Sequence, residues 1–158
     1  MGLASGGSGE GHRSNSLPQY LINYDNAFVF VSEISDGAIS KNLFLKDKKG
    51  KLYLLSALHN KPINLSDLGK KLKLPSGSLR FASEDLLFET LGVRQGCVTA
   101  YALINDMENK KVTFLLDQDV LQFEKVYFHP LVNTASTGIS LSDFRKFLSI
   151  TGHEIVTV

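Results

Sequence analysis

The sequence predicts an α+β domain with a mixed, mostly antiparallel sheet and helices at its periphery. Short apolar segments of strand length outnumber the helical ones, and the helices are scattered among them instead of following every strand. A length of 158 residues suits one hydrophobic core and leaves little room for a second. We therefore expect one domain to carry the whole function.

The start of the chain differs in composition from the rest. Residues 1–16 are rich in glycine and serine and almost free of apolar side chains, so they cannot bury enough surface to order themselves. From residue 17 the apolar content rises, with no later linker-like stretch and no internal repeat. We predict a disordered leader at 1–16 and one folded domain at 17–158.

The first predicted elements of this domain form a hairpin. Two strands, at residues 42–45 and 51–55, are joined by a charged turn in which Gly50 supplies a positive φ. A helix through Leu72 follows, with Asn64 or Ser66 as its N-cap, because its leucines recur at helical spacing.

A second helix is expected at residues 84–91, with Ser83 as its N-cap and Gly92 as a left-handed C-cap. Beyond it, short apolar segments predict strands at residues 98–104, 112–116 and 125–128. After a polar loop, a final helix starting at Ser140 or Ser142 and running through Leu148 precedes a last strand at residues 154–157.

Composition limits the classes of function. Hydrophobic residues make up 43% and charged residues 21%, and no apolar run is long enough for a membrane-spanning helix. The single cysteine cannot form an intramolecular disulfide, and no secretory signal is recognisable, so we expect a cytoplasmic protein. The net charge of +1 gives no overall attraction to nucleic acid. Lysines gather at residues 46–51 and 70–73, where they could contact phosphates, although solvated turn and helix faces are the more common case.

Standard catalytic signatures are mostly absent. The chain has no phosphate-binding loop, no His-Glu-x-x-His motif and no paired cysteines, and its four histidines lack the spacing of metal ligands. We therefore do not expect a metal enzyme. Cys97 could act as a nucleophile, but a thiol packed as a small apolar group is far more common.

Three segments are informative when they are considered together. In the first, residues 40–45, Lys41 opens an apolar strand and can direct its ammonium into a cleft beside the sheet. The second, residues 91–106, contains Gly96 among small residues, so backbone N–H groups can approach a ligand oxygen. The third, residues 127–138, is a polar loop with the sequence Tyr-Phe-His-Pro-Leu-Val-Asn-Thr-Ala-Ser-Thr-Gly.

At these segments the chain resembles the YbaK-type deacylase superfamily, and in particular its branch of prolyl-tRNA-synthetase-associated domain proteins. Members carry a lysine before an apolar strand, a glycine loop ahead of an Ala-Leu-Ile-Asn-Asp-like strand, and a Phe-His-Pro-x-x-Asn loop. The similarity covers residues 41–158 and includes Gly152-His153. It implies a YbaK-like, barrel-like sheet.

The resemblance also implies an activity, the hydrolysis of mischarged aminoacyl-tRNA in trans, typically alanine attached to proline tRNA, without a metal or cofactor. A water nucleophile and an oxyanion held by loop amides suit this ester chemistry. Prolyl-tRNA synthetase is an expected partner. Carried over to this chain, the catalytic positions are Lys41, Gly96, Cys97 and His129, and the substrate-binding positions are Val98, Thr99, Ala100, Asn133, Ser136 and Thr137.

Two departures from the family pattern keep alternatives open. Ala100 stands where members usually have a proline that stiffens the loop, and the region of residues 25–40 is shortened and diverged. One alternative is a weak or inactive homologue that binds tRNA or a synthetase without turnover. Another is a deacylase for tRNA charged with cysteine or serine.

Overall fold

The computed structural model describes residues 19–24, 27–32, 37–128 and 137–158. The predicted leader at residues 1–16 lies outside this part of the chain. Among the described residues no helix is both long and apolar enough to cross a membrane.

The hairpin predicted around Gly50 is confirmed. Strands β3 (Ala38–Lys46) and β4 (Leu52–Leu58) pair in antiparallel register. In the turn between them, the carboxylate of Asp47 accepts the backbone N–H groups of Lys49 and Lys51, both at 2.9 Å, and Gly50 has a φ of +88°. A residue with a Cβ would be strained at that φ, so the glycine and the aspartate together fix the turn.

The large sheet is mixed, as predicted. Its order is β8-β7-β3-β4-β6-β9, and β5 (Arg80–Phe81) pairs with β3. The β3–β4, β3–β5 and β7–β8 pairs are antiparallel, whereas β3–β7, β4–β6 and β6–β9 are parallel. The remaining strands of this sheet are β6 (Val112–Leu116), β7 (Lys125–Phe128), β8 (Thr137–Ser140) and β9 (Ile155–Thr157). Strands β1 (Gln19–Tyr24) and β2 (Ala27–Ser32) form a separate antiparallel pair.

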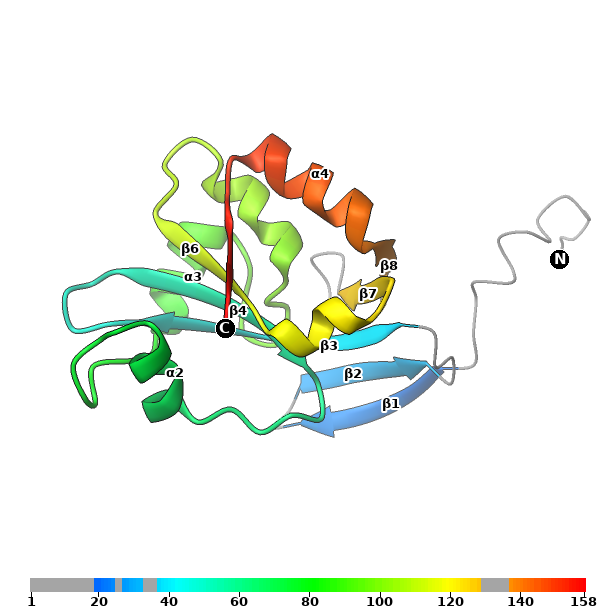
Figure 1. The fold of residues 1–158 in the computed structure, drawn as a ribbon, viewed down its shortest axis with the longest axis horizontal. Helices are drawn as coiled ribbons and strands as arrows, with labels where there is room; N and C mark the ends of the chain where they lie inside the picture. The colour runs from blue at the N-terminus through cyan, green and yellow to red at the C-terminus, as the bar shows by residue number, and fades with distance from the viewer. Residues whose placement is uncertain (1–18, 25–26, 33–36, 129–136) are drawn as a thin grey trace, which may run out of the picture.

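Helices cover both faces of this sheet (Figure 1). Helices α3 (Glu84–Leu91) and α4 (Leu141–Thr151) lie on one face, and α2 (Leu65–Lys71) lies on the other. The predicted caps are present: Asn64 accepts N–H groups at the start of α2, Ser83 does so for α3, and Gly92 and Gly152 are left-handed C-caps.

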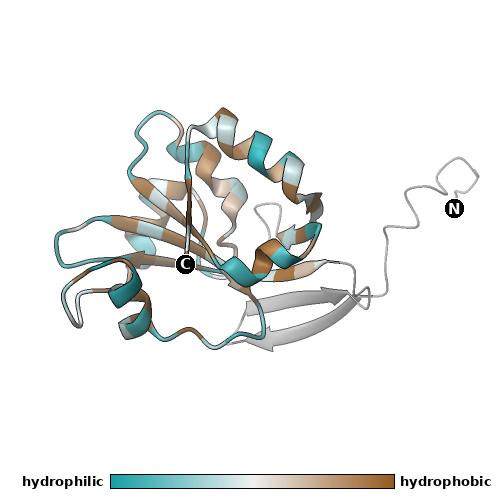
Figure 2. Cartoon of the chain, viewed as in Figure 1, coloured by the Kyte–Doolittle hydropathy of each residue, from teal (hydrophilic) through white to brown (hydrophobic). Residues whose placement is uncertain are grey.

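The apolar side chains form two clusters, one on each face. The larger cluster contains Phe44, Leu54 and Phe114 from the sheet, together with residues of α3 and α4. The smaller one contains Leu45, Leu55 and Leu115, packed against α2. Neighbouring residues of one strand enter different clusters because side chains of a strand alternate between faces. The strands of the sheet are accordingly mostly brown in Figure 2.

The predicted strand at residues 98–104 is wrong. This segment forms the 3₁₀ helix η2 (Ala100–Asp106), and the hydroxyl of Thr99 accepts the backbone N–H of Tyr101 at 3.3 Å. Thr99 is buried and caps the helix, so a β-branched residue that favours a strand by propensity serves here as an N-cap. A second 3₁₀ helix, η3 (Gln118–Gln122), and strands β1, β2, β5 and β8 were also not predicted.

The end of η2 is attached to the end of α4 by buried polar contacts. Asp106 accepts the backbone N–H groups of Lys111 and Val112, both at 2.9 Å. The same carboxylate lies 2.9 Å from Nε2 of His153, and both side chains are almost fully buried. Gly152-His153 therefore has a clear structural role, joining α4 to the core.

Candidate active site

A pocket of about 290 Å³ opens between β3, β5, α3 and the glycine loop at residues 94–99. It lies on the face of the sheet that carries the larger apolar cluster, because Phe44 and Leu87 belong to both. Its apolar floor and polar rim are typical of a site that takes a small organic group. The lining residues are Asn42, Leu43, Phe44, Phe81, Ala82, Glu84, Leu87, Gln95, Gly96 and Val98.

Asn42 is a polar residue of this pocket whose side chain is fixed by a hydrogen bond from the neighbouring strand. It stands opposite Ser56 in the β3–β4 pair, and the fully buried hydroxyl of Ser56 donates a hydrogen bond to Oδ1 of Asn42. Because the carbonyl end of the amide is used in this way, the NH₂ end is the one that can donate to a ligand.

The glycine loop forms the facing wall. Gly96 has a φ of +89°, in the region that favours glycine, and the backbone N–H of Cys97 donates to the carbonyl of Arg94 at 3.0 Å. Val98 lines the pocket, whereas Thr99 and Ala100 are fully buried behind it and half-buried Cys97 packs against the apolar cluster. Without a Cβ at Gly96, a ligand can approach the backbone of this wall closely.

Lys41 leaves β3 on the opposite face from Asn42, since adjacent side chains of a strand alternate. Its ammonium donates to the backbone carbonyl of Lys61. Burial lowers the pKa of Lys41 below its ordinary value, and the negative charge of Asp117 partly opposes this change. Lys41 therefore does not line the pocket that contains Gly96, although it is joined to Asn42 through the strand.

Lys61 in turn is held by two carboxylates. Its Nζ lies 2.7 Å from Oδ1 of Asp117 and 2.8 Å from Oδ2 of Asp119. The hydrogen bonds to these two carboxylates raise the pKa of Lys61 above its ordinary value. Lys61 therefore remains charged at neutral pH.

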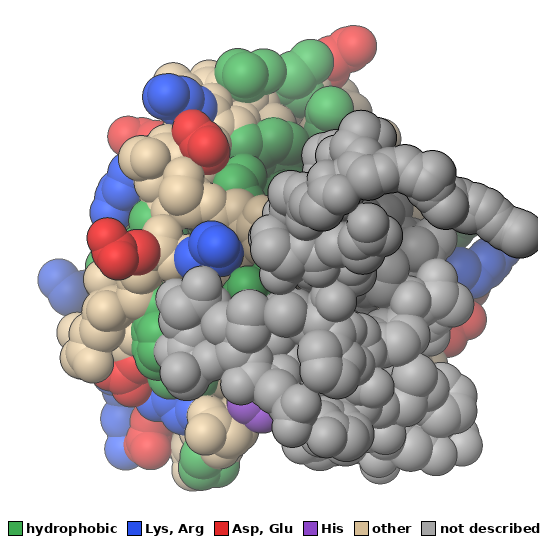
Figure 3. All heavy atoms as spheres, turned by 90° about the vertical axis from the view of Figure 1, so that its right-hand side faces the viewer, with side chains coloured by type: hydrophobic (Ala, Val, Ile, Leu, Met, Phe, Trp, Pro, Cys, Tyr) green, Lys and Arg blue, Asp and Glu red, His purple; other side chains and the backbone are tan. Residues whose placement is uncertain are grey.

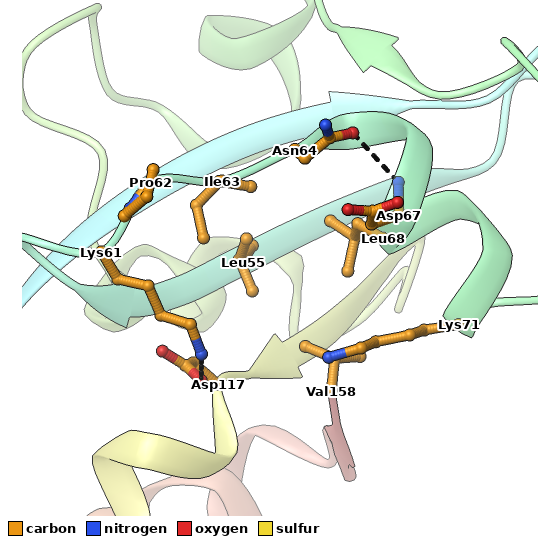
Figure 4. Close-up of a pocket in the computed structure, with 10 residues that line it drawn as sticks. All are labelled: Leu55, Lys61, Pro62, Ile63, Asn64, Asp67, Leu68, Lys71, Asp117 and Val158. Atoms are coloured by element: carbon orange, nitrogen blue, oxygen red, sulfur yellow. Dashed lines mark hydrogen bonds and ion pairs between the residues drawn. The ribbon is translucent and has the colours of Figure 1, made fainter.

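Lys61 and Asp117 also line a second, smaller pocket of about 190 Å³ (Figure 4). Leu55 and Leu68 give it an apolar side on the face covered by α2. Figure 4 shows the ammonium of Lys61 directed at Asp117, while Lys71 extends toward Val158. The two pockets thus belong to opposite faces of the sheet.

The remaining predicted site residues are His129, Asn133, Ser136 and Thr137. The first three lie outside the described residues. Thr137 begins β8, where its backbone is opposite Phe128 of β7, and nothing further is described for its side chain.

Sequence reasoning missed several residues of the larger pocket, namely Asn42, Phe81, Glu84 and Gln95. Asn42 had a signal, because a polar residue in an otherwise apolar strand stands on the opposite face from Lys41. Phe81 is 61% exposed although it is a large apolar side chain, and exposure of this kind cannot be inferred from sequence. Glu84 was noted only as the first residue of α3.

The charged surface has no dominant sign on the side shown in Figure 3. Positive and negative side chains of the described residues alternate there instead of forming one patch. Within the described ranges, no three His, Cys, Asp or Glu side chains are grouped so that they could hold a metal ion.

Comparison with known proteins identifies the family. A family model described as "Aminoacyl-tRNA editing domain" matches residues 29–147. The chain is 52% identical over 121 residues to a Mus musculus protein called prolyl-tRNA synthetase associated domain-containing protein 1, covering 75% of this chain and 70% of the relative.

A bacterial relative, prolyl-tRNA editing protein ProX of Acetoanaerobium sticklandii, is 35% identical over 116 residues, which cover 73% of this chain and 69% of that protein. Among solved structures, a candidate trans-editing enzyme for prolyl-tRNA synthetase has a TM-score of 0.59 at 22% identity, over 78% of this chain and 71% of that one. This likeness confirms the YbaK-like fold. From the match over residues 29–147 and the identity to these relatives, the chain belongs to the aminoacyl-tRNA editing domain family of YbaK type.

Proposed function

We propose that this protein is a metal-independent hydrolase that acts in trans and removes alanine from mischarged proline tRNA. The observation that carries the proposal is the pocket in which Asn42 faces the Gly96 loop, in a chain of an editing family whose relatives are named for prolyl-tRNA synthetase or prolyl-tRNA editing.

The reaction requires an aminoacyl ester to be held beside groups that accept negative charge. Water attacks the ester carbonyl, the carbon–oxygen bond to the ribose breaks, and the ribose oxygen takes up a proton. Backbone N–H groups of the Gly96 loop and the amide of Asn42 are suited to stabilise the oxyanion that forms on the carbonyl oxygen. In this proposal Lys41, Cys97, Thr99, Ala100, His129, Asn133, Ser136 and Thr137 complete or shape the site.

The apolar part of the pocket accounts for selectivity. Phe44, Leu87 and Val98 form a wall with no charged group, suited to a methyl side chain. Binding methylenes alone discriminates by only about 1–3 kcal/mol, so the exclusion of proline has to be steric. Phe44 and Leu87 are buried and therefore packed too tightly to move aside for a ring.

The experiment that tests the proposal is deacylation of proline tRNA charged with alanine, proline, cysteine or serine, in buffer treated with a chelator. We expect release of alanine and little release of proline. Asn42→Ala should slow the release, and Lys70→Ala, which removes an exposed lysine of α2, should not. Release of cysteine or serine instead of alanine would replace the substrate in this proposal and leave the hydrolysis intact.

A binding module without turnover is the second candidate function. Ala100 favours it, because the loop lacks the proline that stiffens it in related proteins, although Ala100 is fully buried at the start of η2. Measurable binding of proline tRNA with no release of any of the four amino acids would establish this function and contradict the hydrolase.

A further inference from the structure

The side chain of Lys41 is held in one position by a hydrogen bond. Its ammonium donates to the carbonyl of Lys61, which follows β4 in a short turn closed by a hydrogen bond from the Lys61 N–H to the carbonyl of Leu58 at 3.1 Å. A lysine side chain loses about 2 kcal/mol of rotamer entropy when it is fixed. One carbonyl can hold it only if that carbonyl is itself immobile.

The carbonyl of Lys61 is immobilised by its own side chain. Asp117 and Asp119 hold Nζ of Lys61 at 2.7 and 2.8 Å. Asp117 is the rigid member, because its side chain is only 3% exposed and its carboxylate also accepts the N–H of Asp119 at 3.1 Å and that of Leu58 at 3.4 Å. The cluster is thereby attached to the end of β4 and the start of η3.

We propose that Lys61, Asp117 and Asp119 form a positioning cluster that holds the ammonium of Lys41 in place for the deacylation reaction. This rests on the proposed function, in which Lys41 is a site residue. None of the three touches the reacting atoms in this account. They act through Lys41, and the negative charge of Asp117 partly offsets the lowering of the Lys41 pKa by burial.

The charged and titratable surroundings of Lys41 define what each substitution will do. Lys61, whose carbonyl accepts from Lys41, is paired with Asp117 and Asp119, and Asp67 and Lys71 of α2 line the adjacent pocket. His59 lies beside the same strand ends, where its backbone N–H donates to the carbonyl of Ile39 at 2.8 Å. Removing a negative charge near Lys41 lowers its pKa, and removing a positive charge raises it.

Two substitutions should therefore shift the pKa of Lys41 in opposite directions. Asp117→Asn removes the attraction that favours the ammonium, so the pKa of Lys41 falls further. Lys61→Met keeps the backbone carbonyl but removes a nearby cation. The charge of Asp117 is then no longer neutralised by Lys61, so the pKa of Lys41 rises. NMR of the ¹⁵N-labelled lysine side chains, with Lys41 assigned through Lys41→Arg, measures both shifts without any assay of activity.

The activity arm uses alanyl-tRNA of proline as the substrate. Both variants should lower kcat with little change in KM, by up to roughly 10²-fold, since a shift of about 1 Å passed along β3 from Lys41 to Asn42 is enough for such a loss. The alkaline limit of the pH profile should move down for Asp117→Asn and up for Lys61→Met. Asp143→Asn, which breaks an exposed ion pair with Lys146 on α4, is the matched control and should change neither.

Asp119→Asn keeps the test decisive if the buried Asp117 cannot be replaced without loss of the fold. Asp119 is 37% exposed, so the variant should remain folded and show a smaller loss of kcat. Unchanged Lys41 titration in folded variants, or shifts of the same sign in Asp117→Asn and Lys61→Met, would overturn the positioning cluster. If the pKa of Lys41 shifts in opposite directions in the two variants but the wild-type protein releases no amino acid, the positioning of Lys41 is supported and the proposed function is contradicted.

Discussion

The two faces of the central sheet use charge in different ways. On the face with the Gly96 loop, the pocket has an apolar floor, and Glu84, the one charged residue that lines it in the described part of the chain, is exposed at the rim. On the face covered by α2, Lys41, Lys61 and Asp117 form a connected group of charges. Strand β3 supplies both faces from adjacent positions, Asn42 to one and Lys41 to the other. A single strand therefore joins a mostly apolar pocket on one face to a group of charged residues on the other.

The largest effect is expected from Lys41→Ala. If the charged face supports the reaction, this variant should lose roughly 10²-fold in kcat, because a shift of about 1 Å at Asn42, its neighbour on β3, is enough for such a loss. Single-turnover deacylation measures the chemical step directly. Lys70→Ala serves as the control because its ion pair with Asp67 is exposed and 3.9 Å long. Equal activity of the two variants would assign the reaction to the Gly96 face alone.

A smaller loss should follow from Gly96→Ala. The φ of +89° makes any Cβ unfavourable by about 1–2 kcal/mol, so the loop moves and the rate falls about tenfold. Gly50→Ala is a close match, because Gly50 has a φ of +88° and open space around it but belongs to the β3–β4 turn. It should lose similar stability and keep full activity. A similar loss of activity in both would show that the effect comes from stability.

The next effect in size concerns Phe81 at the rim of the larger pocket. An exposed ring beside this pocket can stack on an unpaired base, and such stacking contributes about 1–3 kcal/mol. Phe81→Ala should raise KM severalfold with kcat unchanged. Phe88→Ala is the control, since Phe88 is 46% exposed, lies outside the pocket and packs under Arg94 at 4.3 Å. An unchanged KM for Phe81→Ala would leave this ring without a role in binding.

The smallest effect on activity is expected from Asp47→Ala, which should reduce stability instead. Burial disfavours the Asp47 carboxylate, but hydrogen bonds from Lys51, Lys49 and Tyr53 outweigh it, and the pKa of Asp47 lies below its ordinary value. Its contribution to stability is present above the unfolded-state pKa and is lost as the pH falls through the folded-state pKa. Urea unfolding should show a loss of about 1–2 kcal/mol at pH 7 that shrinks in acid. A pH-independent loss would contradict this account.

Local signals explain what the sequence could predict. The turn at Gly50 and the caps at Asn64, Ser83 and Gly92 depend on neighbouring residues only, and all of them are present in the fold. The strand predicted at residues 98–104 was wrong because the strand propensity of Thr99 is outweighed by its role as the N-cap of η2 in a buried loop.

The arrangement of the site could be predicted only in part. The sequence predicted the loop around Gly96 as part of the site, and in the structure this loop and Asn42 line one pocket, which only the alternation of β3 could have indicated. The contact of Lys61 with Asp117 joins residues 56 positions apart, and no local pattern encodes it. Long-range ion pairs of this kind depend on sheet order, which a single sequence does not give.

Strand β3 also determines how the site is lost. It lies inside the sheet, between β4 and β7. Its residue Ala38 pairs with Val126, which is 88 positions further along the chain. An interior strand with such distant partners opens only when most of the domain opens with it. Amide hydrogens at Lys41 and Asn42 should thus be among the slowest to exchange with solvent. Partial fraying at the edges of the fold would leave these two positions in place, so their function should disappear in the same transition as the fold itself.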